Sequence, residues 1–512
     1  MVSAASVRLA DYRPWPFVLS TIRMDVDIRP NDVQVSSRLE LTPQEGADTL
    51  QLWGVDLEIC SIKLDGQELA DDAYSYVDQR LTIHSPPDEP FVLETSCRID
   101  PYNNSSLEGL YASSGLLSTQ CEAEGFRRIT FHPDRPDVLS RWTVRIEASR
   151  DTCPVLLSNG NVIGEEDLVD GRHAVTWEDP FPKPSYLFAL VAGDLREIRN
   201  QFTTASGRAV TLRLHVEEGD EQYTAHAMAS LKRSMAWDEQ VYQLEYDLDQ
   251  YNIVAVRHFN MGAMENKSLN IFNSKLVLAD AETATDSELE RIESVIAHEY
   301  FHNWSGNRIT CRDWFQLSLK EGLTVFRDQS FTADLHSAAV KRIEDVAMLR
   351  NTQFREDAGP TAHPVKPAEY QAIDNFYTTT IYEKGAELIR MLHTLLGQER
   401  FMRGMATYVS RFDGTAATTE DFVHSIVDGA AENGQPLGFD PERFKRWYHQ
   451  AGTPELTVQR QWDAAKGELT LELRQSTPQT PGQAEKQPLV LPITVALVGE
   501  RGRIGEEQLL VM

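Results

Sequence analysis

The most informative part of the chain is residues 295–304, which read Val295-Ile-Ala-His298-Glu299-Tyr-Phe-His302-Asn-Trp304. On a helix, His298 and His302 are four residues apart and project from the same face. This spacing allows two imidazoles to bind one zinc ion, with Glu299 beside the coordination position that stays open. The alternative is a helix whose two histidines serve only packing. We interpret the segment as a helix with a metal site on one face.

A second helix is expected after a turn, because residues 314–326 are mostly apolar apart from Lys320 and Glu321. Eighteen residues separate His302 from Glu321, which is enough for a turn and a helix that returns antiparallel to the first. An acidic side chain in such a segment is unfavourable to bury unless it is paired or bound to a metal. Because hydrolytic zinc sites combine three protein ligands with a water, Glu321 is the candidate third ligand. A salt bridge to a nearby lysine or arginine is the alternative.

A third segment lies upstream and reads Asn260-Met261-Gly262-Ala263-Met264-Glu265-Asn266. Gly262 and Ala263 leave the backbone exposed, so an extended peptide could pair along this edge. Glu265 could then meet the positive α-amine of that peptide. Considered without its surroundings, the segment is more simply a bend with an exposed acid.

Around these segments the sequence pattern changes twice along the chain. Up to about residue 200 it is typical of β-structure: Val33–Leu41 has near-alternating apolar positions, and residues 155–163 predict a hairpin with Asn159-Gly160 at its turn. From Leu456 alternation returns, with a further β-segment at residues 489–498. The region between is α+β. Its expected helices lie at 222–250, 286–304, 337–355 and 382–412, its expected strands at 254–256 and 268–278, and its candidate capping boxes at Thr285-x-x-Glu288 and Ser287-x-x-Glu290.

Composition narrows the class of protein. The 512 residues are 41% hydrophobic and 25% charged, which is typical of an ordinary soluble globular protein. A formal net charge of −29 repels phosphate groups, so neither nucleic acid nor an anionic membrane is an expected partner. Five widely spaced cysteines without a Cys-x-x-Cys motif favour a reducing compartment. The N-terminal residues lack the apolar core of a signal peptide, so we expect a cytoplasmic protein.

Three longer segments share one resemblance. They are Thr119-Gln120-Cys-Glu122-Ala-Glu-Gly-Phe-Arg127, residues 303–314, and Phe376-Tyr-Thr-Thr-Thr-Ile-Tyr382-Glu-Lys-Gly385. Together with the segments above, they resemble the aminopeptidase N family of gluzincin metallopeptidases, in its bacterial alanyl aminopeptidase branch. That family combines Gly-x-Met-Glu-Asn with His-Glu-x-x-His, eighteen residues and Glu. The resemblance runs over essentially the whole sequence.

The family resemblance implies a multidomain fold. Its parts are an all-β N-terminal domain in residues 1–194, an α+β, thermolysin-like zinc catalytic domain in 195–445, and the start of a β-sandwich third domain in 446–512. Bacterial relatives continue with a large helical domain that covers the active site, and this sequence ends before it. An exposed apolar edge is therefore expected in the third region.

The resemblance also implies a role for each matching residue. One zinc ion per chain is held by His298, His302 and Glu321. Glu299 matches the general base, and Tyr382 matches the tyrosine that stabilises the oxyanion. The substrate-binding residues implied by the family pattern, for the free N-terminus and the first side chain, are Glu265, Glu122, Gln120, Met261, Gly262 and Ala263.

The function implied by this resemblance is that of a zinc aminopeptidase of the alanyl aminopeptidase type. It hydrolyses the N-terminal residue from peptides, with a broad preference that includes Ala, Lys, Arg and Leu. A monomer is expected. The alternatives are a zinc endopeptidase, an epoxide hydrolase of the same superfamily, and a shortened, catalytically impaired chain that acts only as a binding module or scaffold.

Overall fold

The computed structural model describes residues 6–431, 434 and 436–512. Its internal contacts divide the chain into two compact units. The large unit comprises Tyr12–Asp313 and Asp413–Ala416. The small unit comprises the remaining chain, chiefly Trp314–Phe412 and Ala417–Met512. The expected multidomain architecture, with β-structure first, a helix-rich middle region and further β-structure last, is confirmed.

The N-terminal part of the large unit is all-β, as its alternating sequence predicts. In β2 and β3, apolar side chains on one face are buried while their neighbours face outward. An eight-stranded sheet results, antiparallel except where β12 pairs with β2. Its strands, in spatial order, are β14 (Asn161–Asp167), β15 (Arg172–Lys183), β12 (Ser140–Ser149), β2 (Phe17–Ile28), β3 (Val33–Pro43), β9 (Phe91–Ile99), β5 (Glu58–Leu64) and β6 (Gln67–Glu68).

Two smaller sheets complete this region. The strands of the first, in spatial order, are β10 (Gly109–Ser113), β11 (Leu116–Gln120), β16 (Leu190–Gly193) and β13 (Val155–Ser158). Those of the second are β4 (Leu50–Trp53), β8 (Arg80–Ile83) and β7 (Tyr74–Val77).

The hairpin predicted at residues 155–163 is wrong in its pairing. Gly160 does adopt a positive φ of 93°, as a tight turn requires. However, β13 pairs with β16, whereas β14 pairs with β15 in the other sheet. The turn is held from outside, because the Asn159 amide donates to the carbonyls of Leu187 and Lys267. The chain thus switches sheets at a turn whose local sequence is that of a hairpin.

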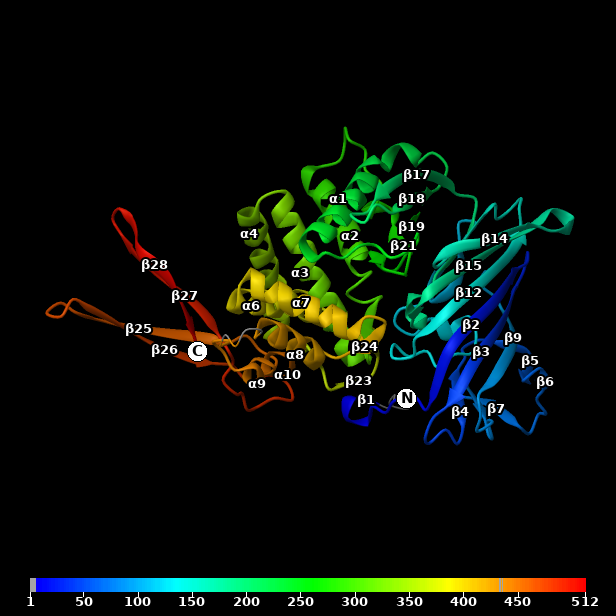
Figure 1. Cartoon of the computed structure of the whole chain (residues 1–512), viewed down its shortest axis with the longest axis horizontal. Helices are drawn as coiled ribbons and strands as arrows, with labels where there is room; N and C mark the ends of the chain where they lie inside the picture. The colour runs from blue at the N-terminus through cyan, green and yellow to red at the C-terminus, as the bar shows by residue number, and fades with distance from the viewer. Residues whose placement is uncertain (1–5, 432–433, 435) are drawn as a thin grey trace. The chain divides into compact units, whose positions relative to one another are not determined.

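A five-stranded sheet follows in the large unit, with helices α1 (Ala225–Tyr242) and α2 (Asp286–Phe301) packed against each other beside it (Figure 1). Its three inner strands are parallel and its two outer pairings are antiparallel. Every residue of the central strand is buried, and the apolar run over its second half, residues 253–256, is typical of such a strand. The strands, in spatial order, are β17 (Arg196–Thr203), β18 (Ala209–Val216), β19 (Gln250–Val256), β21 (Leu269–Asn273) and β20 (Ala263–Met264).

The small unit is mainly helical. Its helices are α3 (Leu317–Leu335), α4 (Ala338–Met348), α5 (Phe354–Asp357), α6 (Gly385–Leu396), α7 (Gln398–Phe412), α8 (Thr419–Ala430), α9 (Pro441–Phe444) and α10 (Arg446–His449), with π-helical turns η8 (Leu349–Gln353) and η10 (Thr380–Lys384). Its short strand pair is β1 (Val7–Arg8) with β23 (Glu369–Tyr370). The single helix predicted at 382–412 is two helices, because Gly397 lies at φ 76° between them.

Helices α3 and α6 of the small unit approach closely at a pair of glycines. A Cβ added to Gly322 would lie 2.8 Å from the backbone carbon of Gly385. A Cβ on Gly385 would lie 2.2 Å from the Ser318 hydroxyl and 3.1 Å from the Gly322 Cα. Only glycine therefore fits at both positions without a shift of backbone.

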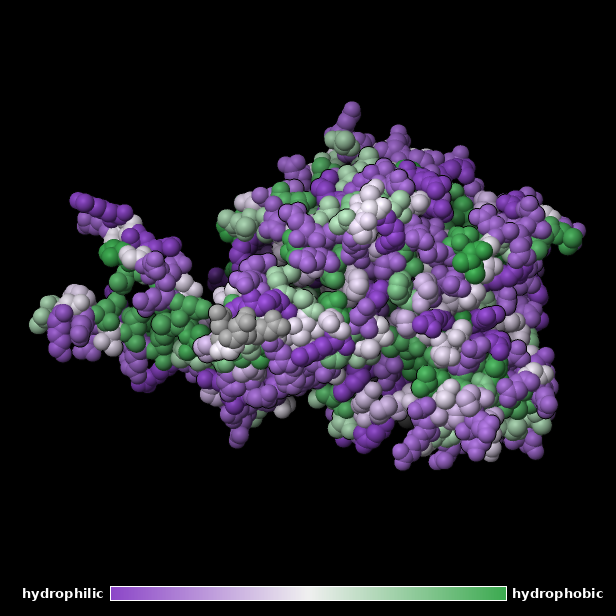
Figure 2. Space-filling model, in the orientation of Figure 1, coloured by the Kyte–Doolittle hydropathy of each residue, from purple (hydrophilic) through white to green (hydrophobic). Residues whose placement is uncertain are grey.

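The small unit ends in two separate β-hairpins (Figure 1). They are β25 (Glu455–Asp463) with β26 (Glu468–Ser476), and β27 (Pro492–Gly499) with β28 (Gly502–Val511). The β-structure predicted from Leu456 onward is confirmed by these strands. Apolar side chains along both hairpins are exposed, as Figure 2 shows, including Trp462 at 62% and Val498 at 77%. Among the described residues, no helix combines the length and the hydropathy that crossing a bilayer would need.

Candidate metal and amine-binding site

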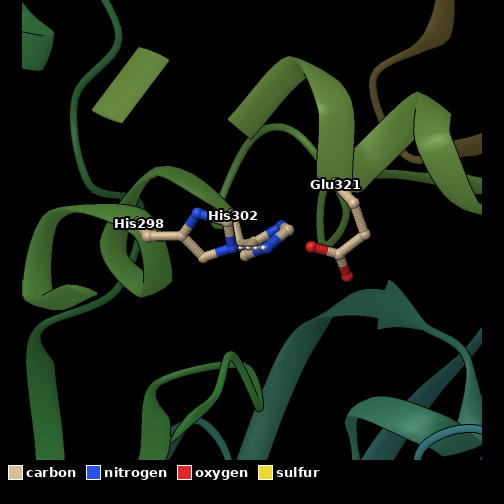
Figure 3. A group of neighbouring side chains, drawn as sticks. All are labelled: His298, His302 and Glu321. Atoms are coloured by element: carbon tan, nitrogen blue, oxygen red, sulfur yellow. Dashed lines mark hydrogen bonds between the residues drawn. The ribbon is translucent and has the colours of Figure 1, made fainter. Parts of the chain in front are cut away.

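Helix α2 carries the two histidines of the predicted metal site. It starts at the capping box of Thr285 and Glu288, as expected, where each residue's side chain binds the other's backbone N–H. It ends at Phe301, so His302 occupies the C-cap position. The Nε2 atoms of His298 and His302 lie 3.0 Å apart, joined by the dashed line in Figure 3, which also draws Glu321.

The hydrogen bond of the second histidine fixes which of its nitrogens faces the site. Nδ1 of His302 lies 2.8 Å from the carbonyl oxygen of Ser305, which can only accept, so Nδ1 carries the hydrogen. In the neutral ring, Nε2 then presents its lone pair toward His298. Two imidazoles on one tetrahedral zinc ion would place their nitrogens about 3.3 Å apart. The pair therefore fits a bound metal, with the backbone orienting a ligand as metal sites commonly require.

Two buried carboxylates stand beside His302. Glu299 is 6% exposed and Glu265 is 3% exposed. Ligand atoms of Glu265, Glu299 and His302 all lie within 4.8 Å of one another. Like charges this close and this far from water repel strongly unless a cation compensates them. This arrangement favours a site for a positive group.

Sequence reasoning missed Tyr251, which belongs to this cluster. Burial, followed by the negative charges of Glu299 and Glu265, raises the pKa of its phenol well above the usual value. Its hydroxyl also accepts a hydrogen bond from the Asn270 side chain. A tyrosine in the wholly buried strand β19 has no pattern that distinguishes it from a core aromatic. Only the fold could have identified it.

Glu265 follows a strand at the edge of the five-stranded sheet. Strand β20 pairs with β21 on one side, and no strand of the described residues pairs with its other side. In the same segment Gly262 is exposed, while Met261 and Ala263 are half-buried. The backbone carbonyl of Glu265 accepts a hydrogen bond from the Asn307 amide at 2.9 Å. The segment is thus an open edge whose acidic end is anchored.

Gln120 is the last residue of β11, and Glu122 lies two residues further along the chain. Glu122 and Glu265 each offer a carboxylate oxygen within 4.8 Å of the other's, although they are 143 residues apart in sequence. Gln120 is 1% exposed and donates to the Glu122 carbonyl at 3.0 Å. In the described part of the chain, its side-chain oxygen has no hydrogen-bond partner. The structure therefore brings a second acid to the Glu265 carboxylate, and a buried amide contacts the backbone of that second acid.

The remaining predicted residues lie in the small unit. Glu321 is in the second turn of α3, 3% exposed, and Tyr382 is in η10, half-buried. The ammonium of Lys320 lies 2.5 Å from Oε1 of Glu321, so the salt bridge considered as the alternative for this residue is present. A carboxylate has two oxygens, and a pair at one leaves the second able to coordinate.

Family comparisons agree with the order of these regions. Residues 13–187 match the Peptidase M1 N-terminal domain, and residues 226–440 match the Peptidase family M1 domain. Residues 452–512 match a domain of unknown function with an Ig-like fold, which covers the two hairpins.

Curated relatives extend the agreement to nearly the whole sequence. The aminopeptidase N of Caulobacter vibrioides is 56% identical over 91% of this chain and 53% of its own length. The aminopeptidase N of Escherichia coli is 51% identical over 96% of this chain and 56% of its own. This chain thus spans about half the length of the curated relatives it matches.

A solved structure provides an independent comparison of the fold. The crystal structure of Legionella pneumophila aminopeptidase A in complex with aspartic acid matches with a TM-score of 0.89 and 32% identity, over 99% of this chain and 57% of that one. Sequence models, curated relatives and three-dimensional similarity agree, over a site in which Glu265 lies near His302 and Glu299 and also near Glu122. This chain belongs to peptidase family M1.

Proposed function

We propose that this chain is a zinc-dependent aminopeptidase that hydrolyses the N-terminal residue from peptides. The observation that carries the proposal is the convergence of two chemistries in the large unit. A pair of imidazole nitrogens 3.0 Å apart can bind a metal. Beside them, the buried acids Glu265 and Glu122 can bind an ammonium group. Relatives named aminopeptidase N at 51–56% identity support this function.

In the proposed site, His298, His302 and Glu321 hold the zinc ion. The sequence spacing of eighteen residues between His302 and Glu321 supports the third ligand. A bound zinc ion supplies Lewis acidity, which lowers the pKa of a coordinated water and polarises a carbonyl group. Lys320 pairs with Oε1 of Glu321, so the metal would be held through the other oxygen of that carboxylate.

Glu299 is the proposed general base. It accepts a proton from the attacking water and delivers it to the departing amine. Its burial suits this role, because a partly desolvated carboxylate is a stronger base than an exposed one. Tyr382 is proposed to donate a hydrogen bond to the oxyanion, by its match to the family motif.

Glu265 and Glu122 are proposed to select substrates with a free N-terminus. An N-acetylated or internal peptide has no ammonium, so it would leave two buried carboxylates mutually repelling. The unpartnered oxygen of Gln120 supports a further acceptor for the ammonium. Met261, with the open backbone at Gly262 and Ala263, would line the pocket for the first side chain, and a Met side chain adapts to several shapes. A broad preference that includes Ala, Lys, Arg and Leu is proposed on this basis.

One observation favours a binding module without turnover. The Lys320 ammonium occupies one oxygen of Glu321, and it would compete with a weakly held metal. Metal analysis of purified protein, paired with an aminoacyl-arylamide assay before and after chelation, separates the two functions. The aminopeptidase requires about one zinc per chain and turnover that chelator abolishes and zinc restores. Absence of turnover both with and without added zinc would identify a binding module, and cleavage of an N-acetylated peptide would identify an endopeptidase.

The cellular setting is proposed from the same features. Peptides with free N-termini are the proposed partners, and a monomer in the cytoplasm is the proposed state. The five free thiols, four of them buried, support a reducing compartment. Fractionation of cells with an antibody, followed by light scattering of the purified chain, tests both points.

A further inference from the structure

A buried polar network lies directly behind the proposed site, within the large unit. The Lys267 ammonium donates to Oδ2 of Asp247 at 2.5 Å and to Oδ1 of Asn303 at 2.9 Å. The Asn303 amide nitrogen donates in turn to Oδ1 of Asp247 at 3.2 Å. Lys267 is two residues after Glu265, and Asn303 is next to His302. The three side chains therefore close a ring that joins the amine-binding segment to the end of the metal-binding helix.

The network is charged and balanced, and its Lys267–Asp247 pair is buried. The side chains of Lys267 and Asp247 are only 1% and 6% exposed. Arg308 adds a second cation, donating to Asp247 at 2.8 Å and to both oxygens of Asp413 at 2.7–2.8 Å. Burial acts to raise the pKa of Asp247, but Lys267 and Arg308 outweigh it and the pKa is lowered. Two cations against two anions make this a rigid unit that would be expensive to open.

Asn307 also connects the backbone of the two segments. The Asn307 side chain donates to the carbonyl of Glu265 at 2.9 Å, and its own N–H donates to the carbonyl of His302 at 2.9 Å. One residue therefore binds the backbone of both functional residues. Oε1 of Glu265 lies 3.9 Å from Nδ1 of His302. The separation between the amine-binding acid and the metal ligand is thus held by side chains that touch neither substrate nor metal.

We propose that Lys267, Asp247 and Asn303 are positioning residues that set the spacing between the substrate's ammonium and its scissile carbonyl. This inference rests on the proposed aminopeptidase function and specifies its substrate class. One carbon separates the two groups in an α-amino acyl substrate, and two separate them in a β-amino acyl substrate. With Glu265 held at a fixed distance from His302, only the α-amino spacing places the carbonyl correctly. A displacement of about 1 Å is enough to change the rate by about 10²-fold.

The test is a ratio of two substrates measured on the same protein sample. The ratio of kcat/KM for L-alanyl-arylamide to that for β-alanyl-arylamide does not depend on the fraction of folded enzyme. We expect Lys267→Met to lower this ratio at least tenfold, chiefly through poorer use of the α-amino substrate. Lys267→Arg, which restores a cation, should recover most of the ratio. Asn303→Ala, which breaks the ring without removing charge, should lower it if Lys267→Met does not fold.

Lys183→Met is the matched control. Lys183 is equally buried in the large unit, 1% exposed, and pairs with Asp179 at 3.2 Å. Its removal should lower the melting temperature as Lys267→Met does, while the substrate ratio stays at the parent value. This inference alone is overturned if the parent protein prefers the α-amino substrate and both Lys267→Met and Asn303→Ala show the same substrate ratio as the parent. A parent that hydrolyses neither substrate with zinc bound overturns the proposed function, and the inference with it.

Discussion

The site region of the large unit and the terminal hairpins of the small unit use their side chains in opposite ways. Around α2 and β20, charged groups are buried, and Glu265, Glu299 and Asp247 are each less than a tenth exposed. Along β25–β28, apolar groups face outward, with Val458 at 53% and Val498 at 77%. Buried charge persists where partners surround it, and exposed apolar surface persists where two-stranded ribbons have no layer packed on them. The first region thus encloses charged side chains inside the fold, whereas the second leaves apolar side chains exposed.

Removal of the metal should have the largest effect on the site region. With His302→Ala we expect loss of bound zinc and of all measurable arylamide turnover, because one of two helix ligands is gone. Metal content by mass spectrometry and turnover at added zinc check both points. The exposed His84→Ala should keep both at parent level. Full zinc occupancy in the His302 variant would contradict the assignment.

Next in size is the loss of the proposed general base. Glu299→Ala should retain zinc while the rate falls by about 10³-fold or more, since proton transfer loses its positioned acceptor. Single-turnover kinetics with a quantified metal content measure this separation. Near-normal turnover would remove Glu299 from the role.

A smaller change is expected at Glu265, the acid proposed to bind the substrate's amine. Glu265→Gln should raise KM for free-amine substrates roughly 10- to 100-fold, the scale of one charged hydrogen bond, and change zinc content little. Initial-rate kinetics with alanyl-arylamide measure it. Exposed Glu282→Gln is the charge-matched control. Equal KM values for parent and Glu265→Gln would eliminate the ammonium-binding role.

Acid should weaken the large unit more than the hairpins, which contain no histidine. Burial lowers the pKa of His132 to about 3 and that of His215 to about 4. Both rings stay neutral when folded but take up a proton when unfolded, so their stability contribution is present above pH 6.5 and decreases as pH falls toward 4. For His132, protonation also breaks the hydrogen bond that Nδ1 accepts from the Asp134 N–H.

We expect the free energy of unfolding to fall by about 2–5 kcal/mol between pH 7 and 4.5 through these two rings. Denaturant titrations across this range should show a shallower pH dependence for His132→Gln than for the parent. The exposed His84→Gln should leave the slope unchanged. Parallel curves for the parent and His132→Gln would show that this ring does not contribute.

The smallest effect concerns the hairpins themselves. Val458→Lys with Val498→Lys should reduce binding of a hydrophobic dye, because it places charge on the exposed apolar faces, while turnover changes less than about twofold. Dye fluorescence and arylamide kinetics measure the two quantities. Val169→Lys, at a valine 80% exposed in the large unit, controls for a lysine added to an isolated apolar position. Unaltered dye binding in the double variant would place the apolar surface elsewhere.

Local sequence predicted the helix of the site well. Three signals predicted helices: the capping box at Thr285, the four-residue histidine spacing and the mostly apolar segment before Glu321. Each extends over only one or two helical turns, and the structure contains the corresponding helices. The strands β3 and β26 followed from alternation for the same reason. Short-range periodicity is visible without knowledge of the fold.

Long-range features could not be predicted in this way. The turn at Asn159-Gly160 has the local chemistry of a hairpin, but its pairing is decided by strands that come later in the chain. Tyr251 reaches the two acids only because β19 lies between β18 and β21. Lys267 and Asn303 form a hydrogen bond although they are 36 residues apart in sequence, and no motif in the sequence around either residue indicates this contact.

The glycine contact between α3 and α6 has a consequence for how the small unit can vary. Gly322 follows Glu321 directly, and Gly385 is three residues after Tyr382. A single methyl group at this crossing would force the two backbones apart and tilt the proposed ligand and the proposed oxyanion donor together. A change at this contact would therefore move Glu321 and Tyr382 together. Any compensating mutation must therefore restore the spacing of both helices at once.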